Sequence, residues 1–305
     1  MLPWHLLVQE EFINQNLLNN KNTIYMKKLF LMAVAIITVT SVWGQKYPDG
    51  YLTDETRPNG LAWLPYPPKL TGAAFTYDFY YYQWGREMRE NEKVSEQALY
   101  DESAALDDVY EGVLGLKLTN ETTPEIITLL QRAVSDAHAA NTKVKNEYKR
   151  VRPFAQFKEP SLKPWEDEEE ASSYSYPSGH STRGWISALV LATVAPEFAE
   201  ELFARAHLYA LNRVICGHHW KTDIDASLML ASGIFAAIVC TDAYQEQLKK
   251  ARAEYQQIKN GGTGVKQAIV VQHPATSQVY TVNGTPAVES SHGIIIQNGQ
   301  KTLRK

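Results

Sequence analysis

The sequence predicts an all-α body followed by a small β-rich appendage at the carboxy terminus. Apolar residues recur at spacings of three and four over most of residues 71–253, which is the helical period. Alternating apolar residues appear only after Gly261, in the segments AIVVQ, QVYTVNG and GIIIQNGQK. The sequence contains neither a Rossmann glycine pattern nor a P-loop, and strands and helices do not alternate in it. These observations exclude the common nucleotide-binding α/β classes.

The helical pattern separates into individual segments. The apolar spacing predicts helices over residues 75–91, 94–115, 123–149, 184–194, 197–213 and 223–244. The third should begin at Thr123-Pro124, because Thr is a helix-capping residue and Pro favours the first helical position. The uncharged run over residues 226–240 is short for a membrane span. We therefore expect it to form a buried core helix.

The amino terminus has the pattern of a secretory signal. From Met26 the chain reads MKKLFLMAVAIITVTSVWGQ, with two lysines, an apolar stretch and small residues before Gln45. The pattern predicts a signal peptide over residues 26–44 and an over-called start over residues 1–25, with a membrane anchor as the alternative. We therefore expect a periplasmic or secreted protein that keeps no stable membrane span after cleavage.

The mature chain divides into a helical domain over residues 45–260 and a tail over residues 261–305. Residues 47–69 are rich in Pro, Tyr and Gly and predict an extended arm on the domain surface. The segment YQQIKNGGTG is interpreted as a linker. The tail resembles the short β-rich terminal modules of exported Bacteroidetes proteins, some of which are sorting signals. A small β appendage without an address function is the alternative.

The composition excludes several classes of protein. The chain has 305 residues, of which 44% are hydrophobic, and a formal net charge of -4. A charge this close to neutral gives no electrostatic reason to expect nucleic acid binding. The only cysteines, Cys216 and Cys240, exclude a disulfide-stapled scaffold and a four-cysteine zinc site. A predicted helix holds their α-carbons too far apart for a bridge, so we expect two buried, unpaired thiols.

The first motif with chemical potential is Lys145 followed seven residues later by Arg152-Pro153. Seven residues are two helical turns, so both cations could lie on one helix face. Two cations before a helix-stopping proline suit an anion site. A solvated basic face is the alternative.

The second motif is Pro177-Ser178-Gly179-His180, which directly precedes a predicted helix. Gly179 lets the backbone approach a ligand closely because it has no side chain. The backbone N–H groups of Ser178 and Gly179 at a helix start could cradle an anion. His180 can exchange a proton near neutral pH. An N-terminal capping turn with an incidental histidine is the alternative.

The third motif gathers Arg213, His218, His219 and Asp223. On a helix, Asp223 would lie one turn after His219 and could accept the imidazole N–H. That bond would leave the other ring nitrogen free to attack an electrophile. His218 has Thr222 at the matching position and is interpreted as a wall residue. A metal site built from both histidines and Asp223 is the alternative, although adjacent helical residues point about 100° apart.

Together the three motifs resemble the three-part signature of the type 2 phosphatidic acid phosphatase superfamily. More narrowly, the segments LAWLPYPPKLTGAAFTYDFYYYQWGR, YPSGHSTRGW and RVICGHHW are similar to the bacterial class A non-specific acid phosphatases. The resemblance covers about residues 48–250. One departure is Asn212, where the superfamily usually carries Ser, which puts one hydrogen bond to the phosphate region in doubt.

The resemblance implies a helical bundle of the phosphatidic acid phosphatase and vanadium haloperoxidase kind, in which the three motifs converge. It implies a metal-independent acid phosphatase that hydrolyses small phosphomonoesters without a cofactor. His219 would attack phosphorus and form a phosphohistidine, His180 would act as proton donor, and Asp223 would orient His219. The implied phosphate-binding residues are Lys145, Arg152, Ser178, Gly179 and Arg213.

Other functions remain open from the sequence. Vanadate-dependent haloperoxidases and lipid phosphatases share the superfamily signature, and a silent phosphate-binding surface protein would need only the cations. The acidic run over residues 166–170 is interpreted as a solvated loop, with repulsion of highly anionic substrates as the alternative. A homo-oligomer is equally open.

Overall fold

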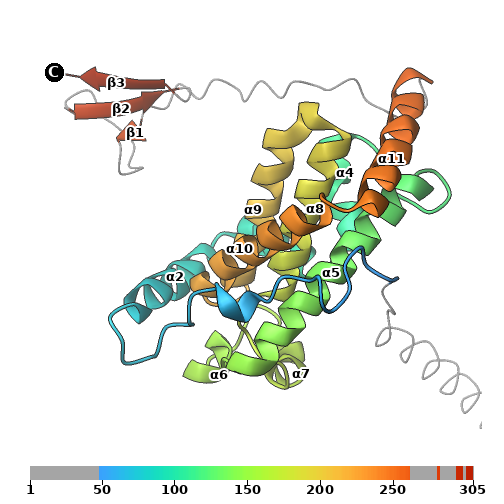
Figure 1. Cartoon of the computed structure of the whole chain (residues 1–305). Coiled ribbons are helices and arrows are strands. Elements are labelled where there is room, and N and C mark those ends of the chain that lie inside the picture. The colour runs from blue at the N-terminus through green and yellow to red at the C-terminus, as the bar shows by residue number, and fades with distance from the viewer. Residues whose placement is uncertain (1–47, 262–279, 282–292, 298–299, 305) are drawn as a thin grey trace, which may run out of the picture. The chain divides into compact units, whose positions relative to one another are not determined.

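The computed structural model describes residues 48–261, 280–281, 293–297 and 300–304. The expected signal peptide, the segment before it and the expected strand AIVVQ lie outside these described residues. Figure 1 shows the helical elements and the three strands along the chain.

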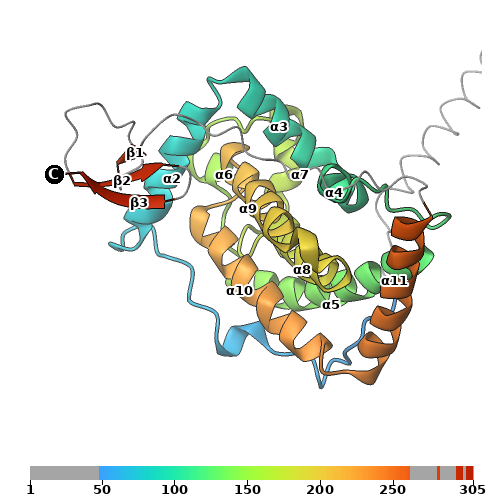
Figure 2. The same ribbon diagram turned by 90° about the horizontal axis from the view of Figure 1, so that it is seen from above.

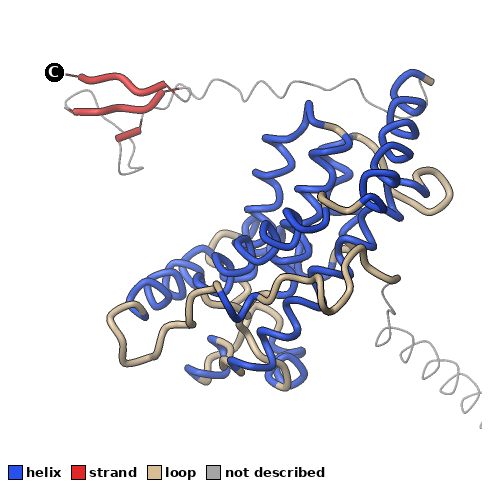
Figure 3. Tube along the Cα trace, viewed as in Figure 1, coloured by secondary structure: helices blue, strands red, loops and turns tan. Residues whose placement is uncertain are grey.

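The body over residues 48–261 is helical, which confirms the all-α prediction (Figure 3). Its elements in chain order are η1 (Gly60–Ala62), α2 (Phe75–Met88), α3 (Glu92–Ser103), α4 (Leu106–Leu114), α5 (Pro124–Tyr148), α6 (Pro153–Phe157), η2 (Pro164–Glu166), α7 (Asp167–Ala171), α8 (Gly179–Val194), η3 (Pro196–Phe198), α9 (Ala199–Ile215), α10 (Lys221–Ile238) and α11 (Asp242–Asn260).

Helix α8 is the centre of the packing and contacts α5, α9 and α10 (Figure 2). Its buried side chains include Ile186, Val190 and Leu191, each at most 1% exposed. Two close helix contacts depend on glycine. A Cβ on Gly184 would lie 2.6 Å from the Tyr209 ring of α9, and one on Gly85 of α2 would lie 2.9 Å from the Val214 carbonyl oxygen. The central helices therefore bring the second and third motifs together.

Two of the expected helices are each divided in the structure. The segment 94–115 breaks at Ala104 and Ala105, whose backbones are extended, so α3 and α4 are separate helices. The segment 223–244 breaks after Ile238, and Thr241 begins α11 by accepting a hydrogen bond from Tyr244 N at 3.2 Å. Apolar periodicity persists across both breaks, which is why it does not reveal them.

Helix α11 extends through Asn260, so residues 255–260 of the expected linker are helical. Tyr255 is only 1% exposed, and its hydroxyl donates to Glu197 at 3.0 Å. Because Tyr255 is buried against the helical body, this part of the chain is a packed helix and not the linker that its polar composition had indicated. Among the described residues, no single helix is long and apolar enough to cross a membrane, and the pair α10 and α11 passes that test only together, bent by 95°.

The arm before α2 is attached to α5 through a buried carboxylate. Asp136 is fully buried and accepts the backbone N–H of Tyr51 at 2.6 Å. Arg57 lies 3.3 Å from the same carboxylate. Leu64, which follows η1, is 5% exposed. These contacts hold the arm against the helical body.

The described strands are β1 (Tyr280–Thr281), β2 (Gly293–Gln297) and β3 (Gln300–Arg304), in the order β1-β2-β3. Both neighbouring pairs are antiparallel, and Gln297 pairs with Gln300. Strand β1 lies within the expected segment QVYTVNG, and β2 lies within the expected segment GIIIQNGQK. Strand β3 begins in that second segment and extends beyond it to Arg304.

Both cysteines are free, but only one is buried. Cys216 is fully buried, whereas Cys240 is exposed at the break between α10 and α11. The expectation of two buried thiols was therefore wrong for Cys240. Cys240 lies one turn after Ala236, which is itself exposed, so it follows the solvent-facing side of α10 and not its buried side.

Candidate active site

The first motif does not occupy one helix face. Helix α5 ends at Tyr148, Lys149 adopts a left-handed backbone with φ 48°, and Arg152 is the N-terminal capping residue of α6. The turn, and not a shared helix, brings the two cations to the same region. Lys145 donates from Nζ to the Tyr174 carbonyl oxygen at 2.6 Å.

Lys145 lies in an electrostatically unfavourable position for an ammonium group. Burial and the nearby Arg152 guanidinium lower its pKa to about 7, and Asp223 and Glu170 oppose this shift. Bringing an anion next to Lys145 would favour its charged form. The site is therefore prepared to gain stabilisation from a negatively charged ligand.

The second motif caps α8, as the sequence indicated. Ser178 is the N-terminal capping residue, and its Oγ accepts from Ser181 N at 3.3 Å. The backbone N–H of Ser178 donates to the Asp223 carbonyl oxygen at 3.3 Å, so the expectation that it helps to cradle an anion was wrong. The backbone N–H groups of Gly179 and His180 find no acceptor within the described chain and are the free amides of this helix start.

His180 lies in the first turn of α8, close to the cations of the first motif. Burial lowers its pKa well below the usual value, and the charges of Arg183, Arg152 and Lys145 add to that effect. Burial and the neighbouring cations therefore favour a neutral imidazole.

The third motif is a turn between two helices. Helix α9 ends at Ile215, and Gly217 adopts φ 80°, a left-handed conformation that side chains disfavour. His218 and His219 follow in this turn, and α10 begins only at Lys221. The argument that His219 and Asp223 lie one helical turn apart was therefore wrong, although the two side chains still meet.

The hydrogen-bond acceptor for His219 is a backbone carbonyl and not Asp223. His219 Nδ1 lies 2.8 Å from the Ser175 carbonyl oxygen, whereas the Asp223 carboxylate is 3.4 Å away. A carbonyl can only accept, so Nδ1 carries the hydrogen and Nε2 carries a lone pair. His219 Nε2 lies 3.1 Å from Arg152 Nη1. This geometry gives the tautomer that a nucleophilic Nε2 requires.

His219 is kept neutral by its surroundings. It is 2% exposed, and burial lowers its pKa well below the usual value, with Arg152 and Arg213 contributing in the same direction. A histidine of this kind retains its lone pair in mildly acidic solution, where an ordinary histidine is protonated.

Asp223 is held by backbone and guanidinium donors. Its carboxylate accepts from Trp220 N at 2.9 Å and from Arg150 Nη1 at 2.6 Å. The other terminal nitrogen of Arg150 lies 2.6 Å from Asp78. Sequence analysis assigned no role to Arg150. The one feature of the sequence that could have indicated a role for Arg150 is its position beside the first motif. Its two carboxylate partners lie more than 70 residues away along the chain, so the sequence does not reveal the pairing.

Arg213 is paired with a carboxylate that sequence analysis also missed. Arg213 is 1% exposed and forms an ion pair with Glu102 at the end of α3. Its Nη2 lies 3.1 Å from His218 Nδ1, so His218 packs beside Arg213 as a wall residue. Among the described residues, Arg213 Nε is buried without a hydrogen-bond partner. It is an available donor for a bound anion.

Asn212 does not extend the anion site. It is 1% exposed, and its side-chain amide donates to Asp101 at 2.7 Å. Its hydrogen bond therefore joins α9 to α3. Asn212 thus uses its side-chain amide to bind Asp101, in keeping with the doubt about a hydrogen bond from this position to the phosphate region.

The two histidines of the third motif face different partners. His218 contacts Arg213, and His219 contacts Ser175 and Arg152. Within the part of the chain that the structure describes, no three His, Cys, Asp or Glu side chains form a group suited to a metal ion.

The acidic segment is a short helix and not a solvated loop. Glu170 of α7 lies 2.6 Å from Arg152 Nη2. Asp167 accepts from Ser161 N at 3.1 Å and lies 3.9 Å from His218 Nε2. Two carboxylates of this segment therefore face the cluster of cations and histidines.

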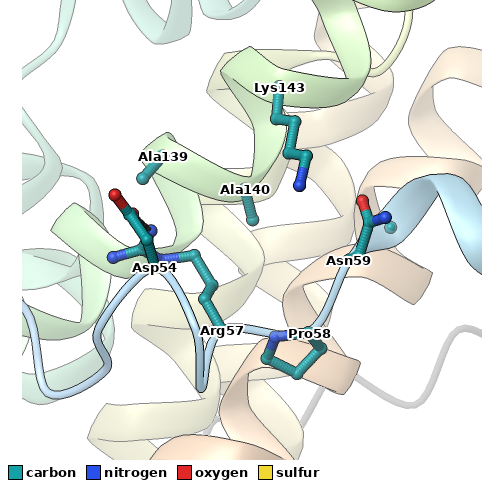
Figure 4. Close-up of a pocket in the computed structure, with 8 residues that line it drawn as sticks. Asp54, Arg57, Pro58, Asn59, Ala139, Ala140 and Lys143 are labelled. Carbon is teal, nitrogen blue, oxygen red and sulfur yellow. Dashed lines mark hydrogen bonds and ion pairs between the residues drawn. The ribbon is translucent and has the colours of Figure 1, made fainter.

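A separate pocket lies between the arm and α5, as Figure 4 shows. It has a volume of about 330 Å³ and is lined by residues that include Arg57, Asn59, Ala140 and Lys143. Arg57 is already paired with Asp54 at 2.6 Å and with Asp136. None of its lining residues belongs to the three motifs.

Comparison with known proteins agrees with the convergence of the motifs. The PAP2 superfamily pattern matches residues 127–247, which include all three motifs. A non-specific acid phosphatase of Providencia stuartii is 35% identical over 213 residues, covering 68% of this chain and 86% of the relative. The chain belongs to the class A non-specific acid phosphatases of the PAP2 superfamily.

Two further acid phosphatases are similar to this chain at about 30% identity, one of them over a shorter part of the chain. A non-specific acid phosphatase of Salmonella typhimurium is 30% identical over 233 residues, covering 75% of this chain and 93% of the relative. An acid phosphatase of Zymomonas mobilis is 31% identical over 150 residues, covering 49% of this chain and 57% of the relative. The family membership confirms the resemblance seen in the sequence.

Proposed function

We propose that this acid phosphatase hydrolyses small phosphomonoesters through a phosphohistidine on His219, without a metal ion. The observation that carries the proposal is the position of His219. Its Nδ1 hydrogen is held by the Ser175 carbonyl oxygen, and its Nε2 lone pair faces the cationic cluster at Arg152. A nucleophile and the charges that attract a phosphoryl group therefore lie side by side.

Phosphate binding would use side-chain cations and backbone amides. Guanidinium groups match phosphoryl oxygens with parallel N–H donors, and a helix start supplies further N–H groups. The Ser178 hydroxyl is fully buried at this helix start, and its Oγ accepts from the Ser181 hydroxyl at 2.9 Å. Its own hydrogen remains to be donated. The proposed ligands are Lys145, Arg152, Arg213, the Ser178 hydroxyl and the backbone N–H groups of Gly179 and His180.

The first chemical step transfers the phosphoryl group to the enzyme. The Nε2 lone pair of His219 forms a bond to phosphorus, and the bond from phosphorus to the ester oxygen breaks. His180 gives its proton to the departing oxygen, which leaves as an alcohol. In the second step a water molecule loses a proton to His180 and attacks phosphorus. The phosphorus–nitrogen bond breaks, which releases inorganic phosphate and restores neutral His219.

The lowered pKa of His180 is compatible with a role as proton donor. Burial and the cations Arg183, Arg152 and Lys145 cause the shift. A bound phosphate dianion offsets those positive charges and favours the protonated imidazole. Substrate binding would therefore raise the pKa of His180 when a proton is needed.

The cations would perform the electrostatic task that metals perform in other phosphatases. Lys145, Arg152 and Arg213 would neutralise the charge that accumulates on the phosphoryl oxygens in the transition state. The lowered pKa of His219 keeps the nucleophile unprotonated in mild acid. The signal-like segment at residues 26–44 supports a periplasmic or secreted location for this activity.

The proposal is tested by hydrolysis of a chromogenic aryl phosphate in mildly acidic buffer containing a chelator. We expect phosphate release that vanadate inhibits, because vanadate adopts the geometry of the transition state. The His219→Ala variant should be inactive, and His207→Ala serves as the matched control because His207 is exposed on α9. Activity that chelator abolishes and a divalent ion restores would contradict metal independence. Halide oxidation with vanadate, without phosphate release, would favour the haloperoxidase alternative.

A further inference from the structure

Every side-chain nitrogen of Arg152 has a partner within the protein. Nε donates to the Ser173 carbonyl oxygen at 3.3 Å, and Nη1 lies near the His218 carbonyl oxygen and His219 Nε2, at 3.0 Å and 3.1 Å. Nη2 donates to Ser173 Oγ at 2.7 Å and pairs with Glu170 at 2.6 Å. A phosphoryl oxygen can therefore bind Nη2 only if Ser173 Oγ or the Glu170 carboxylate moves away from it.

We propose that Glu170 is an internal competitor for Arg152, which phosphate must displace, and that this competition sets the affinity of the site for phosphate. The proposal rests on the function proposed above. Carboxylate and phosphoryl oxygens bind a guanidinium group through the same N–H donors. The Glu170 oxygen, which lies 2.6 Å from Arg152 Nη2 as an ion pair, therefore occupies space that a phosphoryl oxygen needs to reach this nitrogen.

Glu170 is placed so that it can leave. Its side chain is 23% exposed, and α7 has five residues that pack mainly against η2 and α6. The other end of α7 is held separately, because Asp167 accepts the backbone N–H of Ser161 at 3.1 Å. Rotation of the Glu170 side chain toward solvent is therefore sufficient to free Arg152.

The carboxylate on Arg213 shows the opposite arrangement. Glu102 has a side chain 4% exposed and belongs to α3, which packs against α9. This carboxylate is therefore much less accessible to water than that of Glu170, whose side chain is 23% exposed. Glu102 is therefore a fixed partner, and Glu170 is a removable one.

Competition of this kind has two consequences for the enzyme. Phosphate must replace an existing ion pair, so part of its interaction energy offsets the loss of the Glu170 contact. The returning carboxylate also helps to expel inorganic phosphate after turnover. Glu170 therefore weakens both substrate binding and inhibition by product.

The test measures binding of inorganic phosphate by titration calorimetry, together with KM and kcat for an aryl phosphate. The variants are Glu170→Gln, Glu170→Asp and the matched control Glu168→Gln, which removes the same charge from an exposed position on the same helix. We expect Glu170→Gln to lower the Kd of phosphate and the KM roughly fivefold, the scale of a partly exposed ion pair. Glu170→Asp should do the same because its shorter side chain falls short of Arg152. Glu168→Gln should leave both constants within about twofold of wild type.

Several results would overturn the inference. An unchanged or raised Kd in Glu170→Gln would show that Glu170 does not compete, and an equal decrease in Glu168→Gln would assign the effect to overall charge. A wild-type Kd in Glu170→Asp would show that direct contact is not required. Circular dichroism verifies the fold of each variant. If wild type hydrolyses the ester and only the Kd pattern fails, the proposed function stands, whereas a wild type that neither binds phosphate nor hydrolyses the ester refutes both.

Discussion

Arg150 Nη1 lies 2.6 Å from the Asp223 carboxylate, which in turn faces His219 at 3.4 Å. The second terminal nitrogen of Arg150 pairs with Asp78, and both carboxylates are fully buried. Burial raises the pKa of Asp223, and the Arg150 charge opposes that effect. The guanidinium group thus keeps a negative charge behind the proposed nucleophile.

We expect Arg150→Gln to impair turnover through Asp223 without contact with substrate. Loss of the cation should raise the pKa of Asp223, so its ionised form disappears at higher pH than in wild type. The acid limb of the kcat profile should then move to higher pH, with KM changed less than kcat. Arg150→Lys, which keeps the charge, should restore part of the wild-type profile. An unchanged pH profile in a folded Arg150→Gln protein would show that this residue is structural only.

The roles proposed for His219 and His180 should be separable by trapping the intermediate. His219→Ala should form no phosphoenzyme, because the atom that bonds to phosphorus is missing. His180→Ala should still be phosphorylated slowly by esters with good leaving groups, since these need little proton donation. In each variant, the phosphoenzyme is measured as the acid-labile radioactive label that the protein retains after brief mixing with a radioactive substrate. A labelled His219→Ala protein would require a different nucleophile.

Binding of an anion should weaken as pH rises through the pKa of Lys145. Burial and the Arg152 charge lower this pKa to about 7, so the charged form that attracts an anion is lost above that pH. Sulfate is the suitable probe because it remains a dianion throughout. The charges of Arg152, Asp223, Glu170 and Arg183 also act on Lys145.

The matched variant for this prediction is Lys145→Arg, because a guanidinium group stays protonated above pH 7. Its Kd for sulfate should be nearly constant between about pH 6 and pH 9 at fixed ionic strength. An identical rise of Kd in both proteins would assign the pH dependence to another group.

Gly184→Ala should destabilise the fold. The added Cβ would lie 2.6 Å from the ring of Tyr209, which is 1% exposed and has no room to withdraw. Overpacking of this kind costs about 1–3 kcal/mol, and each kcal/mol lowers the Tm of a domain of this size by about 2–4 °C. Gly112→Ala is the control, because a Cβ there meets nothing within 4 Å and alanine favours a helix. A Tm for Gly184→Ala equal to that of Gly112→Ala would contradict tight α8–α9 packing.

Truncation after Asn260, where α11 ends, should leave phosphatase turnover intact. The three motifs all lie before that residue. If the tail is a sorting signal, the truncated protein should accumulate in a different compartment, which cell fractionation can measure. A soluble, folded truncation that has lost turnover would show that the tail completes the catalytic body.

The sequence by itself determined the helical class, the family and the proposed site residues. Helical class follows from a local period of apolar residues, and the start of α5 at Pro124 follows from the preference of proline for the first helical position. The three motifs are likewise short and contiguous. Each one carries its residue types at spacings that can be read without knowledge of the fold.

Only the tertiary structure decided which atoms within those motifs meet. Ser175 replaced Asp223 as the acceptor for His219 Nδ1 from 44 residues away, and Arg150 reached Asp223 across 73 residues. The carboxylates on Arg213 and Arg152 come from α3 and α7, neither of which carries a recognisable motif. Such contacts depend on how helices pack and where the chain turns. Because residue spacing does not record these properties, the pairing of each charged group could not be predicted from the sequence.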